Sequence, residues 1–395
     1  MKVIIAHNNY QTTGGAEVFF HETARVLKKN GHEVALFCSY SDNVNSKWKK
    51  YFPKNINYTG SKIDAIFHFN EMVYSQKTKE SFKRLIKDFK PDIVHVFGIY
   101  IKLTPSFLDI CRHKNIPVVM SCNDYKHITP NYKLYPSNQQ ERFKRRPSLN
   151  KNLLYDVGNY IEFMFHKFLD IYRKNINTFL FASNFMAKET EKYWGKETFK
   201  WDILKNPFNS NDFKISTIQE DYYLFFGRLS EEKGVDILIK AAAKNKECKL
   251  KIIGDGPEKN RLIKLAKKLK ADNVDFCGPL WGNDLKEILS KSRFVVVPSL
   301  WHENFPYVIL QSFALGKPVI GSSVGGIPEL IQENYNGYLY ENDDIIDLAS
   351  KIKFLWENNS IAVKMGSNAK IFSDKNFNDE NFYKNLIKIY KRTLQ

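Results

Sequence analysis

Residues 294–320 read FVVVPSLWHENFPYVILQSFALGKPVI. The segment opens with a short apolar run, passes through a polar loop around Glu303, continues through a helical stretch and ends in a second apolar run. Near-continuous apolar strands joined by a helix are typical of a parallel sheet whose two faces are both covered. The segment therefore predicts one strand–helix–strand unit of an α/β domain.

The same alternation continues in both directions along the chain. Ten short β-branched or aromatic runs are separated by longer amphipathic segments, which predicts parallel sheets in both halves. The runs are Val3–Ala6, Val34–Phe37, Ile93–Phe97, Val118–Met120, Phe179–Phe181, Tyr223–Phe226, Leu250–Ile253, Val274–Phe276, Phe294–Val297 and Val319–Ile320. We expect two doubly wound, Rossmann-like domains with ligand crevices at the carboxyl ends of their strands, facing each other across an interdomain cleft.

The periodic pattern stops near Asn206-Pro207-Phe208, which predicts a hinge. A chain of 395 residues suits two domains of roughly 200 residues, each able to bury its own core. We therefore expect one domain over residues 1–205 and a second over residues 206–375. Residues 376–395 carry apolar side chains at helical spacing, which predicts a helix that folds back on the N-terminal domain.

The net charge of +17 is shared unevenly between the halves. Residues 1–205 hold 33 Lys and Arg against 19 Asp and Glu, whereas the remainder holds 27 against 24. Such a field attracts phosphates, acidic saccharides, anionic lipid surfaces or nucleic acid, although a Lys-rich composition also follows from an AT-rich genome. No recognisable nucleic-acid motif accompanies the charge, so we expect no nucleic-acid partner.

Several features predict a cytoplasmic protein. No uninterrupted run of about 18 apolar residues is present, and the first residues enter a short strand pattern without the apolar stretch of a secretion signal. The five cysteines include no C-x-x-C pair, which favours reduced, packed thiols over disulfides or a zinc site.

Two segments are each compatible with two environments. Residues 125–151 are basic and aromatic, including Arg142–Arg146, and we interpret them as a solvated surface turn, with a ligand-contacting loop as the alternative. Residues 160–169 are apolar on more than one helical face. We expect this helix to pack in the core, and membrane contact is the alternative.

Three loops at predicted strand ends carry residues suited to bind a phosphorylated ligand. Gly14-Gly15 lies between the first strand and a helix, where glycine lets the backbone approach a phosphate at a helix N-terminus, although a plain tight turn has the same pattern. Arg228 and Lys233 follow the strand at Tyr223–Phe226 and are suited to neutralise a diphosphate. Glu303 and the amide of Gln311 are suited to bind hydroxyl groups.

These motifs together resemble those of the retaining glycosyltransferase family 4 of the GT-B fold, and the resemblance covers essentially the whole chain. The matching stretches are Gly14-Gly15-Ala16-Glu17, Gly227-Arg228-Leu229 with Lys233-Gly234, and Glu303 with the strand entry Ala314-Leu315-Gly316-Lys317-Pro318-Val319. The resemblance implies an N-terminal acceptor-binding domain and a C-terminal domain that binds a nucleotide-sugar donor.

The resemblance also implies roles for individual residues. Arg228 and Lys233 are expected to bind the donor diphosphate, Glu303 to contact the donor sugar, and the Gly14-Gly15 loop to lie over the donor. The expected catalytic residues are Glu303, Asn123, Arg228 and Lys233. The expected nucleotide-sugar contacts are Gly14, Gly15, Arg228, Lys233, Gly254, Leu280, Glu303, Asn304, Phe305 and Gln311. No metal or other cofactor is expected, and no two Asp residues stand in a D-x-D spacing.

Two positions depart from the family pattern. Gln311 stands where a second glutamate usually holds the nucleotide ribose, and its amide still donates and accepts hydrogen bonds. Asn123, in Cys122-Asn123-Asp124-Tyr125, stands where relatives have a histidine near the reacting sugar, and an amide cannot exchange a proton. A catalytically impaired, sugar-nucleotide-binding partner subunit is therefore the alternative function.

The sequence does not favour a nicotinamide dehydrogenase. Gly254-Asp255-Gly256 follows a predicted strand, but Pro257 lies within the turn and Lys259 replaces the third glycine of a dinucleotide fingerprint. We expect instead a metal-independent sugar transfer from a UDP-sugar to a glycan or lipid-linked acceptor. The expected role is the synthesis of a cell-surface polysaccharide, with peripheral contact to the inner membrane face through the basic N-terminal half.

Overall fold

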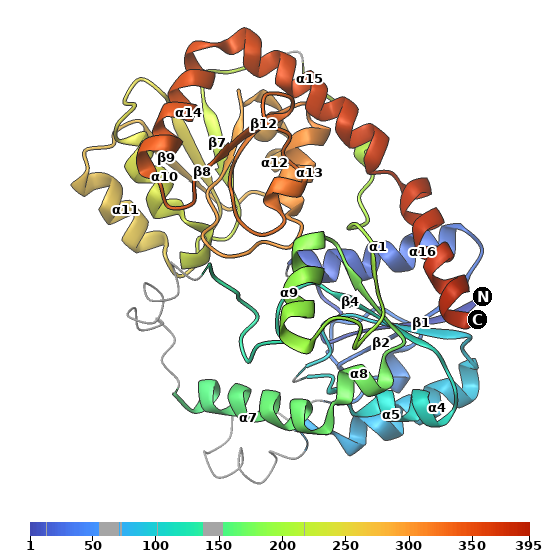
Figure 1. Cartoon of the computed structure of the whole chain (residues 1–395). Helices are drawn as coiled ribbons and strands as arrows, with labels where there is room; N and C mark the ends of the chain where they lie inside the picture. The colour runs from blue at the N-terminus through green and yellow to red at the C-terminus, as the bar shows by residue number, and fades with distance from the viewer. Residues whose placement is uncertain (13, 55–70, 72, 101, 137–152, 217) are drawn as a thin grey trace. The chain divides into compact units, whose positions relative to one another are not determined.

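A computed structural model describes residues 1–12, 14–54, 71, 73–100, 102–136, 153–216 and 218–395 (Figure 1). The basic cluster Arg142–Arg146 lies outside the described residues. The chain forms two compact units. The first unit comprises Met1–Lys133, Asn152–Pro207 and Asp379–Gln395, and the second comprises Leu134–Lys151 and Phe208–Asn378.

The first unit is built on a six-stranded parallel sheet with the order β2-β1-β3-β4-β5-β6. Its strands are β1 (Lys2–His7), β2 (Glu33–Cys38), β3 (Ile93–Val96), β4 (Val118–Cys122), β5 (Thr178–Phe181) and β6 (Trp201–Ile203). The order reverses between β1 and β3, which places a topological switch point there. The central strands β3 and β4 are buried throughout and β1 is buried from Val3 onward, as expected for strands covered on both faces.

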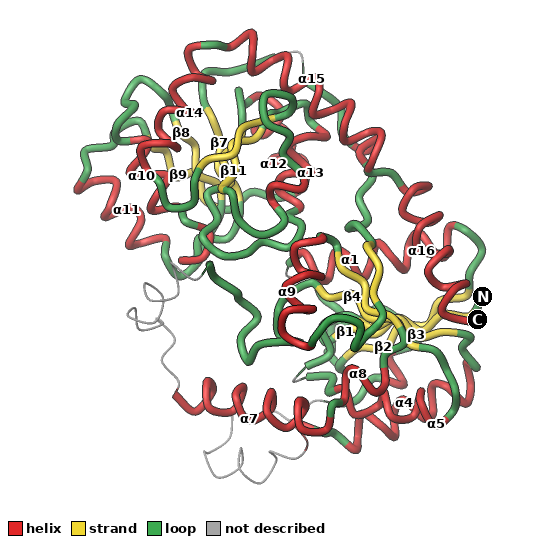
Figure 2. Tube along the Cα trace, viewed as in Figure 1, coloured by secondary structure: helices red, strands yellow, loops and turns green. Residues whose placement is uncertain are grey.

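Helices pack against both faces of this sheet (Figure 2). They are α1 (Gly15–Lys29), α4 (Gln76–Phe89), α5 (Leu108–His113), α7 (Leu153–Leu169), α8 (Ile171–Asn175), α9 (Asn184–Trp194) and α16 (Asp379–Leu394), with the 3-10 turns η1 (Lys49–Tyr51) and η2 (Pro105–Phe107). Within one layer, α8 contacts both α5 and α7, and η2 contacts α4, α5 and α8. The helices α1 and α16 lie side by side (Figure 1).

The C-terminal helix α16 is anchored in the first unit. Leu386 is fully buried in the same core cluster as the strand residues Val3 and Ile5. The guanidinium of Arg25 donates to both carboxylate oxygens of Asp379, at 2.9 and 2.6 Å. Apolar packing in the core and the ion pairs of Asp379 with Arg25 and Lys29 of α1 therefore attach the last helix to the first unit.

The second unit repeats the architecture with a parallel sheet of order β12-β11-β10-β7-β8-β9. Its strands are β7 (Tyr223–Phe226), β8 (Leu250–Ile253), β9 (Val274–Gly278), β10 (Val295–Val297), β11 (Val319–Ser322) and β12 (Gly337–Tyr340). Its helices are α10 (Val235–Ala242), α11 (Lys259–Lys268), α12 (Gly282–Lys291), α13 (Tyr307–Ala314), α14 (Ile345–Glu357) and α15 (Asn359–Asn376), with the turns η3 (Ser210–Asp212), η4 (Glu231–Lys233) and η5 (Ile327–Glu329).

The prediction of two doubly wound parallel α/β folds is confirmed, since each predicted run overlaps one strand. The sequence patterns missed β6 and β12, which are short strands at the edges of their sheets. Four of the five cysteines are buried, Cys277 is exposed, and all five are free thiols. In the described part of the chain, no helix combines the length and apolar character that crossing a bilayer requires.

The expected core packing of residues 160–169 is wrong for most of their apolar side chains. Ile161 and Phe168 are 44% and 84% exposed, although both are large and apolar. The side of α7 that faces the unit instead carries Glu162 and His166, of which 3% and 4% are exposed. Glu162 pairs with Lys126 and His166 bonds to the Val73 carbonyl, and these polar contacts, not apolar packing, decide which side of the helix is buried.

Candidate active site

The second unit has its topological switch point between β7 and β10. These strands are neighbours in the sheet, where Leu224 pairs with Val295, but the chain runs outward from them in opposite directions. In open α/β sheets the crevice outside the carboxyl ends of such strands is where ligands bind. The loop 227–234 follows β7 and the loop 298–306 follows β10, so both border this crevice.

The structure brings two predicted site residues from these loops into direct contact. The Lys233 ammonium donates to Oε1 of Glu303 at 2.6 Å. The Glu303 side chain is 7% exposed and the Lys233 side chain 26%. The Lys233 cation therefore neutralises a buried carboxylate and still reaches solvent. An anionic ligand that enters from solvent can contact this cation directly.

Two further residues orient this pair and were missed by the sequence motifs. The Ser299 hydroxyl donates to the same Glu303 oxygen at 2.7 Å, and the Trp301 ring lies 5.6 Å from the Lys233 ammonium. The backbone carbonyl of Ser299 accepts from Ser322 at 2.6 Å, which ties the β10 loop to β11. Ser299 and Trp301 stand four and two residues before Glu303, in the same strand-end loop, and that position is the signal that points to them.

Glycines allow the loops at this edge to approach one another closely. A Cβ atom on Gly234 would lie 1.9 Å from the Pro298 carbonyl oxygen, and one on Gly254 would lie 1.9 Å from the Gly227 carbonyl oxygen. Both glycines have positive φ, at 65° and 144°. A Cβ on Gly325, which follows β11, would lie 2.3 Å from the Glu303 carbonyl oxygen. Residues other than glycine would therefore clash in these turns. The glycines let the backbones of neighbouring loops come into direct contact.

The remaining predicted residues of the second unit also follow its strands. Arg228 is exposed directly after β7, and no carboxylate of the described residues lies within 4 Å of its guanidinium. Gly254 follows β8, and its N–H donates to the carbonyl of Gly278 at 2.9 Å. Leu280 is half-buried two residues after β9.

The loop after β10 leads into α13. Asn304 and Phe305 are 7% and 5% exposed, and Gln311 is half-buried within the helix. The first turn of α13 follows Pro306, so its N–H groups and positive dipole end lie at the same strand edge.

The other two predicted loops belong to the first unit. Gly14 is the N-cap of α1 and Gly15 is its first residue, at the end of the loop that follows β1. Asn123 follows β4, and its buried Nδ2 has no hydrogen-bond partner among the described residues. The structure therefore places Gly14, Gly15 and Asn123 at the carboxyl edge of the first sheet and the other predicted residues at that of the second.

Asp124, next to Asn123, is a buried carboxyl group in the loop after β4 that the sequence motifs did not single out. Burial raises the pKa of its carboxyl group, while hydrogen bonds from the Lys126 N–H and the Tyr100 hydroxyl oppose that change. The Tyr100 hydroxyl donates to Oδ1 at 2.8 Å. This carboxyl group fixes the loop that presents Asn123.

Comparisons with known proteins agree with this geometry. Residues 13–210 match the model of glycosyltransferase family 4, and residues 209–372 match the model of glycosyl transferases group 1. The chain belongs to glycosyltransferase family 4. Together the two models cover every strand of both sheets except β1, and this glycosyltransferase has the GT-B architecture that the motifs predicted.

Individual relatives extend over most of the chain. An uncharacterised 42.6 kDa protein in a cps region of Klebsiella pneumoniae is 28% identical over 88% of this chain and 92% of its own length. For several other curated relatives, the match covers only about half of the relative's own length. Sucrose-phosphate synthase from Thermosynechococcus elongatus has the same fold, with a TM-score of 0.76 at 18% identity over 99% and 98% of the two chains.

A second solved structure shares the fold and contains a ligand. HepE of Anabaena in complex with UDP-glucose aligns with a TM-score of 0.70 at 17% identity, over 99% of this chain and 100% of HepE. At this identity the likeness concerns the fold.

Proposed function

We propose that this glycosyltransferase moves a sugar from a UDP-sugar to a glycan or lipid-linked acceptor, with retention of configuration and without a metal ion. The observation that carries the proposal is the Lys233–Glu303 contact at the switch point between β7 and β10. A UDP-sugar supplies a diphosphate for the cation and sugar hydroxyls for the carboxylate, so one ligand satisfies both groups. The UDP-glucose complex of HepE supports the choice of donor.

The charge that develops on the departing diphosphate needs stabilisation. Lys233 and the exposed Arg228 follow the same strand, and the α13 N-terminus adds a positive dipole end. In this proposal these groups replace a divalent cation. Among the described residues no cluster of three or more His, Cys, Asp and Glu side chains has the arrangement of a metal site.

Retention requires that the acceptor hydroxyl attack the sugar from the face that the diphosphate leaves. The acceptor oxygen then forms the new glycosidic bond as the bond from the anomeric carbon to the phosphate oxygen breaks, and the acceptor proton passes to the leaving phosphate. No side chain has to accept that proton. This chemistry accommodates Asn123 as a hydrogen-bonding residue in place of a histidine.

The basic first unit and the Klebsiella relative support the proposed biological role. A net positive field over residues 1–205 favours an acceptor that carries phosphate or acidic sugars at an anionic membrane face. The occurrence of the relative in a cps region supports a role in surface polysaccharide synthesis.

The proposal is tested by incubating the purified chain with UDP-sugars in EDTA and measuring UDP release and sugar transfer to a lipid-linked acceptor. We expect transfer with the anomeric configuration of the donor, read by NMR of the product. Inverted product would refute the retaining mechanism. Nucleotide binding without transfer to any acceptor would instead favour the impaired partner subunit.

A further inference from the structure

Helix α7 turns most of the apolar side chains of residues 157–169 away from the unit on which it packs. Of the 17 large hydrophobic side chains that are exposed among the described residues, six lie on this helix, each between 38% and 84% exposed. These six define the α7 stripe: Val157, Tyr160, Ile161, Met164, Phe165 and Phe168. Their spacing of three and four residues places them along one side of the helix, over a length of about 16 Å.

Polar contacts fix this orientation of the helix. The Glu162 carboxylate lies 2.8 Å from the Lys126 ammonium, and the two side chains are 4% and 11% exposed. One turn later, His166 Nε2 donates to the Val73 carbonyl at 2.8 Å. Rotating the helix to bury the stripe would break both contacts and leave a buried Lys126 without its counter-charge, which is costly. The exposure of the stripe is therefore built into the fold.

Exposed cations border the stripe. A cavity of about 460 Å³ is lined by Phe165 and Leu169 of α7 together with Arg112 of α5 and Lys174 of α8. Arg112 and Lys174 are exposed, and no carboxylate of the described residues lies within 4 Å of either cation. A third exposed cation, Lys167, lies within the helix itself.

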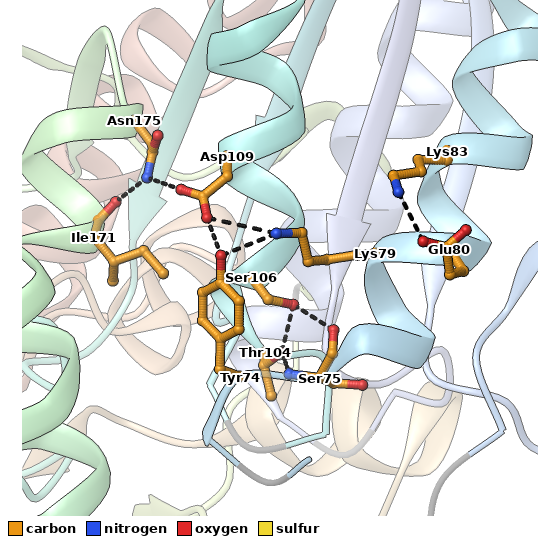
Figure 3. Close-up of polar contacts among 10 residues, drawn as sticks. All are labelled: Tyr74, Ser75, Lys79, Glu80, Lys83, Thr104, Ser106, Asp109, Ile171 and Asn175. Atoms are coloured by element: carbon orange, nitrogen blue, oxygen red, sulfur yellow. Dashed lines mark hydrogen bonds and ion pairs between the residues drawn. The ribbon is translucent and has the colours of Figure 1, made fainter. Parts of the chain in front are cut away.

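The carboxylate that also lines this cavity is already neutralised. Asp109 accepts hydrogen bonds from the Tyr74 hydroxyl and, at 3.0 Å, from Asn175 Nδ2, while the Lys79 ammonium lies 3.8 Å away (Figure 3). The charge that the cavity leaves available to a ligand is therefore positive.

We propose that the α7 stripe and the cations beside it bind the surface of an anionic lipid bilayer, with α7 lying in the plane of the interface. Apolar and aromatic side chains flanked by Lys and Arg are the composition of helices that insert between lipid headgroups and acyl chains. Arg112 and Lys174 then bind headgroup phosphates beside the inserted Phe165. A second copy of the chain fits the stripe less well, because its cations would meet like charges.

The inference names the surface through which the proposed membrane contact is made. It rests on the proposed function in one respect, that the acceptor lies at an anionic membrane. The test is co-sedimentation of the full chain with vesicles of phosphatidylcholine, alone or with about 30 mol% phosphatidylglycerol. We expect binding to the anionic vesicles that weakens as salt rises from about 0.1 to 0.5 M. The double variant I161S/F168S should lower the partition coefficient roughly tenfold or more, because both side chains would no longer be buried in lipid.

Matched variants separate the apolar and charged contributions. I371S removes an isoleucine on α15 that is 60% exposed, between the 44% of Ile161 and the 84% of Phe168, and should leave vesicle binding unchanged. R112E/K174E should remove the preference for anionic over neutral vesicles. Equal binding by wild type and I161S/F168S would overturn the proposal, and so would a wild-type dimer that this variant dissociates.

The two proposals fail in different ways. I161S/F168S should keep wild-type UDP affinity and melting temperature, because its substitutions lie on an exposed face of the first unit. Vesicle binding is measured without turnover, so a chain that fails to transfer sugar still tests the stripe.

Discussion

The Nζ atom of Lys233 lies 2.6 Å from Oε1 of Glu303, although seventy residues separate them in the chain. The contact crosses the point where the strand order of the second sheet reverses, from the loop after β7 to the loop after β10. Each of the two residues therefore depends on the other for its charge balance.

Glu303→Gln should reduce sugar transfer about 100-fold or more while changing UDP affinity by less than about threefold. The amide keeps the size of the side chain but loses the charge that is expected to act on the sugar. Steady-state kinetics and calorimetry of the same preparation measure the two quantities. The matched control is Glu247→Gln, an exposed glutamate before β8. Wild-type turnover of the Glu303 variant would refute its assignment to the site.

Lys233→Ala should weaken UDP binding by about 10- to 100-fold, since a charge-assisted hydrogen bond to phosphate contributes roughly 1.5–3 kcal/mol. Calorimetric titration measures the change. Lys246→Ala serves as the control because Lys246 is exposed before β8, at the amino end of the sheet. Unchanged affinity in the Lys233 variant would mean that the cation serves only to balance Glu303.

The sequence predicted the kinds of residue in this site but not their pairing. Lys233 and Glu303 were found because each lies directly after an apolar run, where parallel strands present their loops. That they touch depends on β7 lying beside β10, and strand order is a property of the whole sheet. Ser299 was missed because its role is to orient Glu303, which only the folded loop reveals.

The orientation of helix α7 is a second feature that the sequence pattern could not predict. Its composition shows apolar side chains on more than one face, and burial of the apolar face is the usual outcome. Here the buried face is selected by Lys126, which follows β4 and lies 36 residues before Glu162 in the chain. No local pattern contains that contact. The edge strands β6 and β12 were missed because several of their positions are only partly buried, so neither shows the continuous β-branched and aromatic run of a strand covered on both faces.

Gly234→Ala should destabilise the second unit by about 2–4 kcal/mol, because the new Cβ would lie 1.9 Å from the Pro298 carbonyl oxygen. We expect a fall of roughly 5–10 °C in its thermal transition. Gly282→Ala is the matched control, since Gly282 also has positive φ but has no atom within 4 Å of the added Cβ. Its cost should be only the backbone penalty of about 1 kcal/mol. Equal effects of the two variants would contradict the close approach of the loops.

Asp379 should make the attachment of α16 sensitive to acid. Hydrogen bonds from Arg25 hold the pKa of Asp379 below its usual range, against the opposing effect of partial burial. Because the folded pKa is lowered, the stabilisation is complete above the unfolded pKa of about 3.9 and is lost as pH falls through the folded value. Melting temperatures between pH 5 and pH 3 should therefore fall more steeply for wild type than for Asp379→Asn.

The neighbouring Glu380 provides the control for this pH dependence. Glu380→Gln removes an exposed carboxylate from the same first turn of α16 and should leave the steep wild-type profile in place. A wild-type profile in Asp379→Asn would show that the Arg25 contact adds nothing to stability.

The central claim is that the crevice between β7 and β10 binds the diphosphate of a UDP-sugar through protein cations. Calorimetric titration of the full chain with UDP, GDP and ADP in EDTA tests it most directly. The account predicts binding of UDP in preference to the other two, with an affinity that added Mg²⁺ does not raise. Binding that requires Mg²⁺, or an absence of binding by all three nucleotides, would contradict it.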